Sequence, residues 1–302
     1  MTGGSSETDR TSVREHVRPG VTRAEEVVAN ASGENFPVAL RVLPAVPRRH
    51  LTALYGFARL TDDLGDEARE TGQSDADLRL GLLDELDADV DRIYQGVTPH
   101  SPVMQKMAVT VAECHVPAQP LRDLIQANRQ DQRVTRYQTF AELARYCELS
   151  ANPIGQIVLY IFGVATPDRI AFSDSICTAL QLAEHWQDVA EDLANGRIYL
   201  PAEDLKRFNI TEGDLAVPTA GLAVRDLMRF ETYRARKLLD QGAPLVGTLR
   251  GAARLAVAGY LAGGRAALAA IRAQRYDVLS ATARPRKPRL VAELAMAYAR
   301  GK

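Results

Sequence analysis

Residues 168–194 read DRIAFSDSICTALQLAEHWQDVAEDLA and are followed by Asn195-Gly196, a pair that commonly ends a helix in the left-handed conformation. Three carboxylates, Glu184, Asp188 and Asp192, follow one another at intervals of four residues within an otherwise apolar run. Side chains four residues apart lie on the same face of an α-helix. The stretch therefore predicts a largely buried helix that carries an acidic stripe.

The rest of the chain has the same helical character. Alanine, leucine, arginine and glutamate dominate it, and alternating β-branched and polar residues are almost absent. We expect further helices at 47–70, 76–94, 102–113, 119–129, 140–164 with a break near Asn152-Pro153, 219–241 and 245–271, and a last short helix near the C-terminus. No repeat or linker divides this pattern. The sequence predicts a flexible N-terminal tail at residues 1–20 and a single all-α catalytic domain at residues 21–302.

Composition excludes several classes of protein. The 302 residues carry 37 basic and 38 acidic side chains, a net charge of −1, so no overall positive field attracts nucleic acid. A hydrophobic share of 46 % excludes a disordered chain. The three cysteines lack metal-ligand spacing and the N-terminus lacks a signal peptide, which predicts a cytoplasmic protein. The most apolar stretch, 154–166, is shorter than the roughly 20 residues that span a bilayer and is expected in the core or along an apolar cavity.

A second acidic run, TDDLGDE, occupies residues 61–67. Asp62 and Asp66 lie one turn apart on the predicted helix, and like charges at this spacing destabilise a helix by roughly 0.2–0.5 kcal/mol per pair. A solvated acidic surface would explain either acidic run alone. Both runs, however, lie within otherwise apolar helices, which favours a binding site.

Carboxylates that face each other across a helical bundle need divalent cations to relieve their repulsion. Hard oxygen ligands favour magnesium, which binds through few carboxylates and leaves room for a substrate phosphate. The metal would neutralise a diphosphate leaving group and assist ionisation of the C–O bond. The expected Mg²⁺ ligands are Asp62, Asp63, Asp66, Glu184, Asp188 and Asp192.

Basic side chains suited to phosphate accompany both acidic runs. Arg59 lies one turn before Asp62, and Arg197 and Tyr199 begin the segment that follows the second run. Arginine suits phosphate because its planar fork donates two parallel hydrogen bonds. A third basic element, ARPRKPR at 283–289, is explained equally well as a further phosphate-binding group or as a solvated loop that also favours contact with a membrane surface; its cations are Arg284, Arg286, Lys287 and Arg289.

Two stretches together resemble the paired aspartate-rich motifs of the squalene/phytoene synthase family. They are YGFARLTDDLGDE at 55–67 and QDVAED at 187–192, the latter continued by GRIYLP at 196–201. Their order and separation make the pair far more specific than either acidic run. The resemblance extends from about residue 27 to the C-terminus. It implies a class I isoprenoid synthase fold, an all-α bundle around a central apolar cavity, and a Mg²⁺-dependent enzyme that acts on a prenyl diphosphate.

Within that family, three stretches look most like the hydroxysqualene synthase branch of bacterial hopanoid and squalene biosynthesis. These are ENFPVA at 34–39, YCELSANPIG at 146–155 and EHWQD at 184–188. The resemblance implies that presqualene diphosphate, made by a companion presqualene diphosphate synthase, reacts with water to give hydroxysqualene and diphosphate without a reductant. So apolar a substrate also implies transient contact with the inner face of the membrane.

The same reading assigns roles to single residues. Arg59, Arg197, Tyr199, Tyr276 and Gln187 are expected to bind the substrate. Aromatic faces would stabilise the cation left by ionisation, an interaction of roughly 2 kcal/mol or more when desolvated; the candidates are Tyr55, Phe57, Tyr146 and Phe162. Asn35 and Asn152 would hold the attacking water. His185 and Trp186 are expected to pack beside the second motif.

Four departures from the family pattern bear on this reading. Ala58 replaces a frequent cysteine, and Glu184 stands where an asparagine commonly begins the second motif. Gln187 replaces the arginine usual in phytoene and squalene synthases, which agrees better with a substrate that carries one diphosphate than with two substrates bound together. Residues 32–35 lack the His-Ser-Lys-Ser pattern of many two-diphosphate members.

Two alternatives stay open. The first is a head-to-head prenyl transferase that makes presqualene diphosphate, squalene or phytoene from farnesyl or geranylgeranyl diphosphate. The second is a non-catalytic helical protein that uses its acidic faces to bind partners. A nicotinamide site is not indicated, because no glycine-rich turn joins a strand to a helix.

Overall fold

The computed structural model of the chain describes residues 43–66 and 73–300, with the backbone alone described at residues 66, 73–75 and 300. Every helix or strand assigned in this part of the chain is an α-helix, and its single extended pairing is a parallel bridge between Arg136 and Ile198. The all-α prediction is confirmed. The expected tail at 1–20 and the candidate Asn35 lie outside the described residues.

The helices agree closely with the ranges expected from the sequence. In chain order they are α3 (Ala45–Asp66), α4 (Gln73–Tyr94), α5 (Pro102–Cys114), α6 (Ala118–Asp131), α7 (Phe140–Ser150), α8 (Asn152–Ile161), α9 (Pro167–Gln187), α10 (Val189–Ala194), α11 (Ala202–Arg207), α12 (Glu212–Leu215), α13 (Leu222–Gly242), α14 (Leu245–Thr248), α15 (Gly251–Ala273) and α16 (Lys287–Arg300). The expected break near Pro153 separates α7 from α8, with the proline in the first turn of α8.

Two helices predicted as continuous are divided. The helix expected at 168–194 breaks at Asp188, whose backbone angles of φ −109° and ψ 18° leave the helical region. The carboxylates nevertheless keep their helical spacing, because the backbone hydrogen bonds between residues four apart are retained. Asp188 N donates to Glu184 O at 3.0 Å, and Asp192 N donates to Asp188 O at 2.8 Å. The helix expected at 245–271 divides into α14 and α15, since Leu249 and Arg250 are extended and Gly251 takes a positive φ of 55°.

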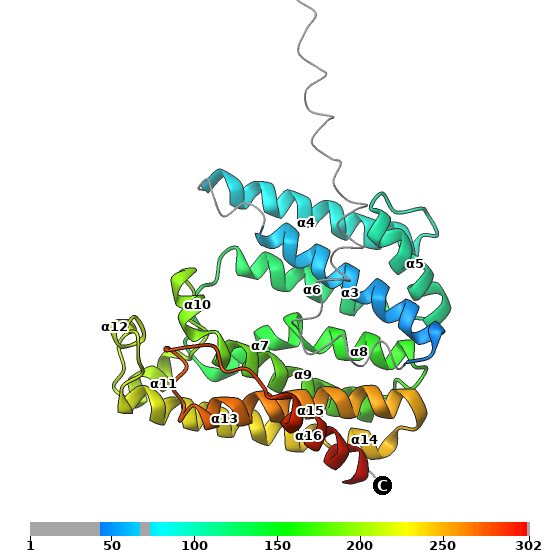
Figure 1. Cartoon of the computed structure of the whole chain (residues 1–302). Coiled ribbons are helices and arrows are strands. Elements are labelled where there is room, and N and C mark those ends of the chain that lie inside the picture. The colour runs from blue at the N-terminus through cyan, green and yellow to red at the C-terminus, as the bar shows by residue number, and fades with distance from the viewer. Residues whose placement is uncertain (1–42, 67–72, 301–302) are drawn as a thin grey trace, which may run out of the picture. The chain divides into compact units, whose positions relative to one another are not determined.

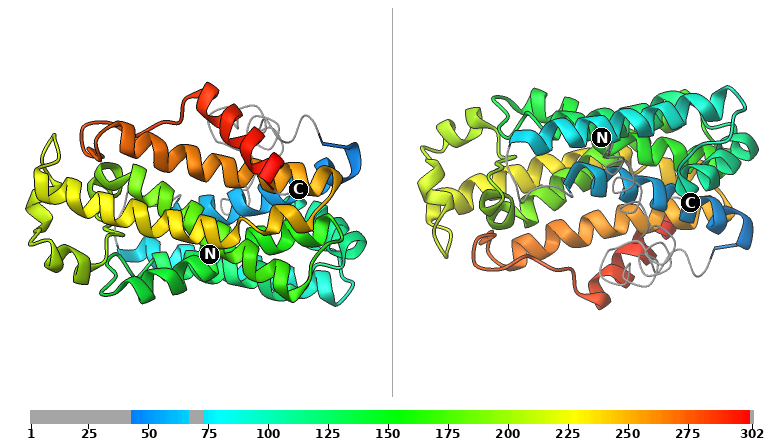
Figure 2. Two further views of the ribbon diagram at one scale, coloured as in Figure 1. Left: turned by 90° about the horizontal axis from the view of Figure 1, so that it is seen from below. Right: turned by 90° about the horizontal axis from the view of Figure 1, so that it is seen from above.

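The helices stack in three layers. Figure 1 shows α3, α4, α5 and α6 above, α7, α8 and α9 in the middle, and α13, α15 and α16 below, and the two views of Figure 2 show α16 lying along the outside of α15. Helix α9 packs against α7 and α8 on one side and against α13 and α15 on the other. The helix that carries the second acidic motif is therefore central to the packing.

Two apolar clusters fill the spaces between these layers. One is centred on α9, α13 and α15, and the other on α3, α5, α6 and α8, with Phe162 and Tyr260 packed against both. The apolar stretch at 154–166 contributes Ile157, Val158 and Leu159 to this interior, so its prediction as core is confirmed. Helix α13 approaches α9 closely at Gly242, where a Cβ atom would lie 2.5 Å from the carbonyl oxygen of Phe172. None of the helices in the described part of the chain is long and apolar enough to cross a membrane.

Candidate active site

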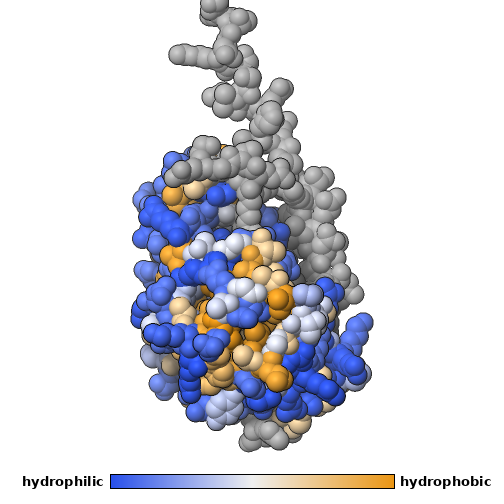
Figure 3. Space-filling model, turned by 90° about the vertical axis from the view of Figure 1, so that its left-hand side faces the viewer, coloured by the Kyte–Doolittle hydropathy of each residue, from blue (hydrophilic) through white to orange (hydrophobic). Residues whose placement is uncertain are grey.

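The two acidic motifs meet at one end of the helical stack. The last turns of α3 and the junction of α9 with α10 both lie at the left-hand end in Figure 1. A pocket of about 360 Å³ joins them: Gly65 of the first motif lines it together with Ala194, Asn195 and Arg197, which follow the second. Figure 3, a view onto this end, shows apolar residues gathered at its centre within a hydrophilic surround. The structure thus brings together two segments about 120 residues apart, as the family resemblance implies.

In the first motif, the charged side chains already have partners. Arg59 Nε lies 2.9 Å from Asp63 Oδ1, an ion pair within α3 between half-exposed groups. Asp62 is exposed and accepts a hydrogen bond from Asn128 Nδ2 of α6 at 3.3 Å. The side chain of Asp66 lies outside the described residues. Asp62 therefore faces α6, and a ligand would have to share Arg59 and Asp62 with their present partners.

In the second motif, the carboxylates become more buried toward the break in the helix. Glu184 is exposed, whereas Asp188 and Asp192 are half-buried. Burial raises the pKa of Asp188, the nearby Glu191 raises it further, and Arg284 opposes both effects. Arg284, from the basic segment, thus lies close enough to influence the second motif. The junction of α9 and α10 is an acidic surface with a cation beside it.

His185 and Trp186 lie behind this surface, as the sequence predicted. Trp186 is fully buried, and His185 is 7 % exposed and stacks on Tyr199 with ring centroids 3.6 Å apart. Burial lowers the pKa of His185 to about 3, and the charge of Arg197 adds to this effect. His185 is therefore neutral at pH 7 and supports the Tyr199 ring as a packing residue.

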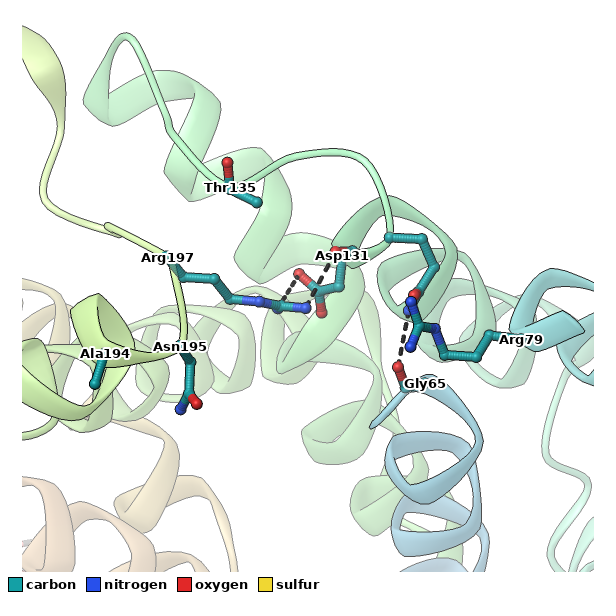
Figure 4. A pocket seen from close by; sticks show the side chains of 8 residues that line it. Gly65, Arg79, Asp131, Thr135, Ala194, Asn195 and Arg197 are labelled. Atoms are coloured by element: carbon teal, nitrogen blue, oxygen red, sulfur yellow. Dashed lines mark hydrogen bonds and ion pairs between the residues drawn. The ribbon is translucent and has the colours of Figure 1, made fainter. Parts of the chain in front are cut away.

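A half-buried carboxylate that the motifs do not contain organises the site. Asp131, the last residue of α6, accepts a hydrogen bond from Tyr146 Oη at 2.8 Å and pairs with Arg197 Nη1 at 3.2 Å. Arg197 also donates to the backbone oxygen of Asp131 and to Tyr199 Oη, each at 3.1 Å. Figure 4 shows the two interactions between Arg197 and Asp131 across the pocket.

These contacts determine the charge state of the group. Burial alone would lower the pKa of Arg197, but Tyr199 and Asp131 raise it overall, so the guanidinium stays charged. Burial raises the pKa of Tyr146 well above its usual value, and the neighbouring Asp131 raises it further. Tyr146 is therefore a neutral hydrogen-bond donor, and Arg197 is a cation held in one position beside the second motif.

A further arginine holds the segment that carries Arg197. Arg136 donates from Nη1 to the backbone oxygen of Gly196 at 2.7 Å, and its Nε pairs with Glu212 at 2.9 Å. Next to it, Ile198 N donates to Thr135 O at 3.0 Å, in the bridge between the two segments. Arg136 thus ties the segment after α6 to the segment after α10.

The remaining predicted residues lie in different surroundings. Asn152 is buried and accepts a hydrogen bond from Thr178 Oγ1 at 2.9 Å, which joins α8 to α9. Gln187 is buried and donates to the backbone oxygen of Ala283. Tyr276 has a positive φ of 61° after α15, and the guanidinium of Arg229 lies 5.3 Å from its ring centroid. The roles of Asn152 and Gln187 toward a substrate, and that of Tyr276, stay predictions.

Deep side chains on α9 and α15 retain accessible surface. Burial raises the pKa of the Cys177 thiol to about 12 and that of Tyr260 above its usual value, yet both side chains are half-buried rather than sealed. Elsewhere on α15, a Cβ atom at Gly259 would meet no atom within 4 Å.

The predicted metal ligands fit a magnesium ion in chemistry, because all are hard oxygen donors. The nearby pocket is lined by Gly65 of the first motif and by residues that directly follow the second. Among the described side chains, however, no three carboxylates, histidines or cysteines lie close enough to hold one metal ion. The ligand set therefore stays a prediction.

Comparison with known proteins gives consistent matches along the chain. Residues 29–291 match the squalene/phytoene synthase family. The 15-cis-phytoene synthase of Synechocystis sp. is 32 % identical over 279 residues, covering 88 % of this chain and 81 % of that protein. The hydroxysqualene synthase of Rhodopseudomonas palustris is 32 % identical over 218 residues, covering 72 % of each chain.

Solved structures show the same likeness. The crystal structure of squalene synthase HpnC from Alicyclobacillus acidocaldarius superposes with a TM-score of 0.75 at 38 % identity, covering 84 % of this chain and 95 % of that one. A dehydrosqualene synthase in complex with a ligand superposes with a TM-score of 0.81 at 23 % identity, which shows a shared fold; the match covers 92 % of this chain and 95 % of that one.

Proposed function

Because the chain belongs to the squalene/phytoene synthase family, whose enzymes act on prenyl diphosphates, we propose that it converts presqualene diphosphate and water to hydroxysqualene and diphosphate. The observation that carries this proposal is a pocket lined by Gly65 of the first acidic motif and by Ala194, Asn195 and Arg197, which directly follow the second, with Arg197 fixed at its edge by Asp131. A cation held beside two groups of carboxylates suits a substrate that departs as an anion.

In the proposed reaction, the bond between carbon and the diphosphate oxygen breaks, and both electrons leave with the diphosphate. The remaining cyclopropylcarbinyl cation rearranges, the oxygen of water forms the new C–O bond, and the lost proton goes to solvent. Arg59, Arg197 and Tyr199 bind the diphosphate. Mg²⁺, when bound by the aspartates and Glu184, would neutralise charge on the leaving group.

The apolar part of the substrate needs a long dry space. The accessible faces of Cys177 and Tyr260, with the open side of Gly259, support a location between α9, α15 and the upper layer. Tyr55 is half-buried on α3, and Tyr146 is buried on α7. In this proposal both rings stabilise the cation, and water-binding remains assigned to Asn152 with Asn35.

One observation supports water capture over head-to-head condensation. Gln187, where the second diphosphate of a condensing enzyme would require a cation, donates to the backbone oxygen of Ala283 instead. The likeness to the hydroxysqualene synthase of R. palustris does not decide between the two reactions. Phytoene synthases are equally similar, so the alternative is a prenyl transferase acting on farnesyl or geranylgeranyl diphosphate.

Product analysis distinguishes these reactions. The protein is incubated with MgCl₂ and either presqualene diphosphate, with and without NADPH, or farnesyl diphosphate alone. We expect hydroxysqualene from presqualene diphosphate irrespective of NADPH, and no product from farnesyl diphosphate. Asp188→Ala should abolish diphosphate release, whereas Asp168→Ala, at an exposed position in the first turn of the same helix, should leave it unchanged. Squalene formed only with NADPH, or consumption of farnesyl diphosphate, would overturn the proposal.

We further infer that the enzyme is cytoplasmic and takes its substrate from the membrane surface through α16. This helix exposes Val291 (65 %), Met296 (36 %) and Tyr298 (39 %). Arg284 and Arg286 before the helix, and Lys287 and Arg289 in its first turn, are all exposed. Exposed apolar side chains beside a group of cations suit the surface of an anionic bilayer. A companion presqualene diphosphate synthase would supply the substrate.

A further inference from the structure

Arg79 lines the same pocket from α4, a helix that carries neither acidic motif. In Figure 4 its side chain enters from the α4 side and that of Arg197 from the opposite side, with Asp131 between them in this view. The Nε and Nη1 atoms of Arg79 are buried and have no hydrogen-bond partner among the described residues. The pocket thus holds two unused donors of a permanently charged group.

Two of the acceptors that line the pocket are already bound. Asp131 is held by Tyr146 and Arg197, and the backbone oxygen of Gly65 accepts a hydrogen bond from Gln132 Nε2 at 3.0 Å. A buried donor left without an acceptor carries a desolvation penalty, which is larger when the donor is charged. An acceptor that arrives with a ligand would remove this cost.

The charges of the pocket indicate the sign of that ligand. Of the eight residues that line it, Arg79 and Arg197 are cationic and Asp131 is anionic. The Asp131 charge is balanced by Arg197 at 3.2 Å, so that of Arg79 remains uncompensated within the lining. The volume of about 360 Å³ falls within the range of roughly 300–1,000 Å³ typical of small-molecule sites. The site is therefore built for a small anion.

We propose that Arg79 is a substrate-binding residue that donates, through Nε and Nη1, to oxygens of the diphosphate group. This rests on the proposed function, because it assigns to the leaving group of that reaction a contact from a third element. With Arg197 on the opposite wall, the diphosphate would be held between two guanidinium groups from α4 and from the segment after α10. Arginine suits this position because two adjacent N–H groups match two phosphate oxygens.

The test is calorimetric titration of the full chain with inorganic diphosphate in MgCl₂. Arg79→Gln should weaken binding tenfold or more, and Arg79→Lys, which keeps the charge but loses the fork, should weaken it by a smaller factor. Arg122→Gln is the matched control, since Arg122 pairs with Asp87 and Asp91 away from the pocket. Its affinity should stay within twofold of the wild type, and thermal unfolding without ligand should confirm that each variant is folded.

Affinities of both Arg79 variants equal to that of the wild type would overturn the inference, even with an active enzyme. If Arg79→Gln does not fold, an unchanged affinity of Arg79→Lys would do the same. If the wild type releases no diphosphate from any prenyl diphosphate, while Arg79→Gln still loses affinity for inorganic diphosphate, the proposed function fails and the anion site stands. The two failures are thus separable.

Discussion

Glu231 shows how the environment of a single residue alters a property of the whole protein. This fully buried carboxyl group on α13 lies 3.2 Å from Arg234, which pairs with the buried Asp204 at 2.8 Å. Burial raises the pKa of Glu231 to about 8; Arg234 opposes the shift, and Asp204 adds to it. The folded protein thus holds a proton that the unfolded chain releases near pH 4.5.

This proton makes stability depend on pH with a defined sign. The raised pKa of Glu231 contributes stability that is fully present below about pH 4.5 and is lost as the pH rises to about 8, because only the folded state binds the proton in this window. The free energy of unfolding should fall by about 1.4 kcal/mol per pH unit from this group. Urea unfolding between pH 5 and pH 8 measures the slope.

Glu231→Gln should remove that slope, because the amide is neutral at every pH and keeps the shape of the protonated acid. Asp226→Asn is the control: Asp226 is exposed, on the same helix, and pairs with Arg229 at 2.8 Å. It should leave the slope unchanged. Equal slopes in the wild type and Glu231→Gln would show that Glu231 is not protonated in the folded state.

Among the elements, α9 is held in position by neighbouring helices on several sides. Gly155 of α8 and Gly264 of α15 face its side chains, and Gly242 of α13 faces its backbone. Backbone atoms cannot move aside as the end of a flexible side chain can. The contact at Gly242 therefore sets the distance between α13 and α9.

Gly242→Ala should destabilise the protein by about 1–3 kcal/mol, the usual cost of overpacking, because its Cβ would lie 2.5 Å from Phe172 O. Gly81→Ala is the matched control, since Gly81 is exposed within α4 and a Cβ there meets nothing within 4 Å. It should stabilise by up to about 1 kcal/mol through helix propensity. Chemical denaturation of both variants measures their free energies of unfolding. A Gly242→Ala variant as stable as the wild type would mean that α13 can move away from α9 without cost.

The sequence predicted those elements that neighbouring residues alone determine. The spacing of apolar residues predicted the helices, and the spacing of the carboxylates in the second motif predicted that they share one helix face. The break at Asp188 was missed, because no proline or glycine marks it. Asp131 and Arg79 were missed for another reason: each is a single charged residue on a helix without a motif, and only tertiary packing brings it to the pocket. The run NRQDQR around Asp131 gives no local sign that one acid is half-buried.

At the scale of the whole molecule, the proposed membrane contact of α16 can be tested directly. Each cation near an anionic membrane contributes about 1 kcal/mol, so Arg286→Gln with Lys287→Gln should weaken binding to vesicles containing anionic lipid about 30-fold. Val291→Ser with Met296→Ser should weaken it as well, whereas Leu222→Ser, which alters a side chain 83 % exposed on α13, should not. Vesicle co-sedimentation measures this. Wild-type protein that does not sediment, or α16 variants that sediment equally, would exclude the surface.

The contacts made by Asp131 and Arg136 also govern the order in which the molecule can assemble. The hydrogen bond from Arg197 to Asp131 O joins residues 66 positions apart, and the pair between Arg136 and Glu212 joins residues 76 positions apart. Closing such loops costs chain entropy before any contact forms. We therefore expect the pocket to form only when α6 and the segment after α10 have docked, and we expect partly folded chains to lack affinity for its ligand. A bound diphosphate would then act as a ligand of the native state alone and would stabilise it in proportion to the logarithm of its concentration.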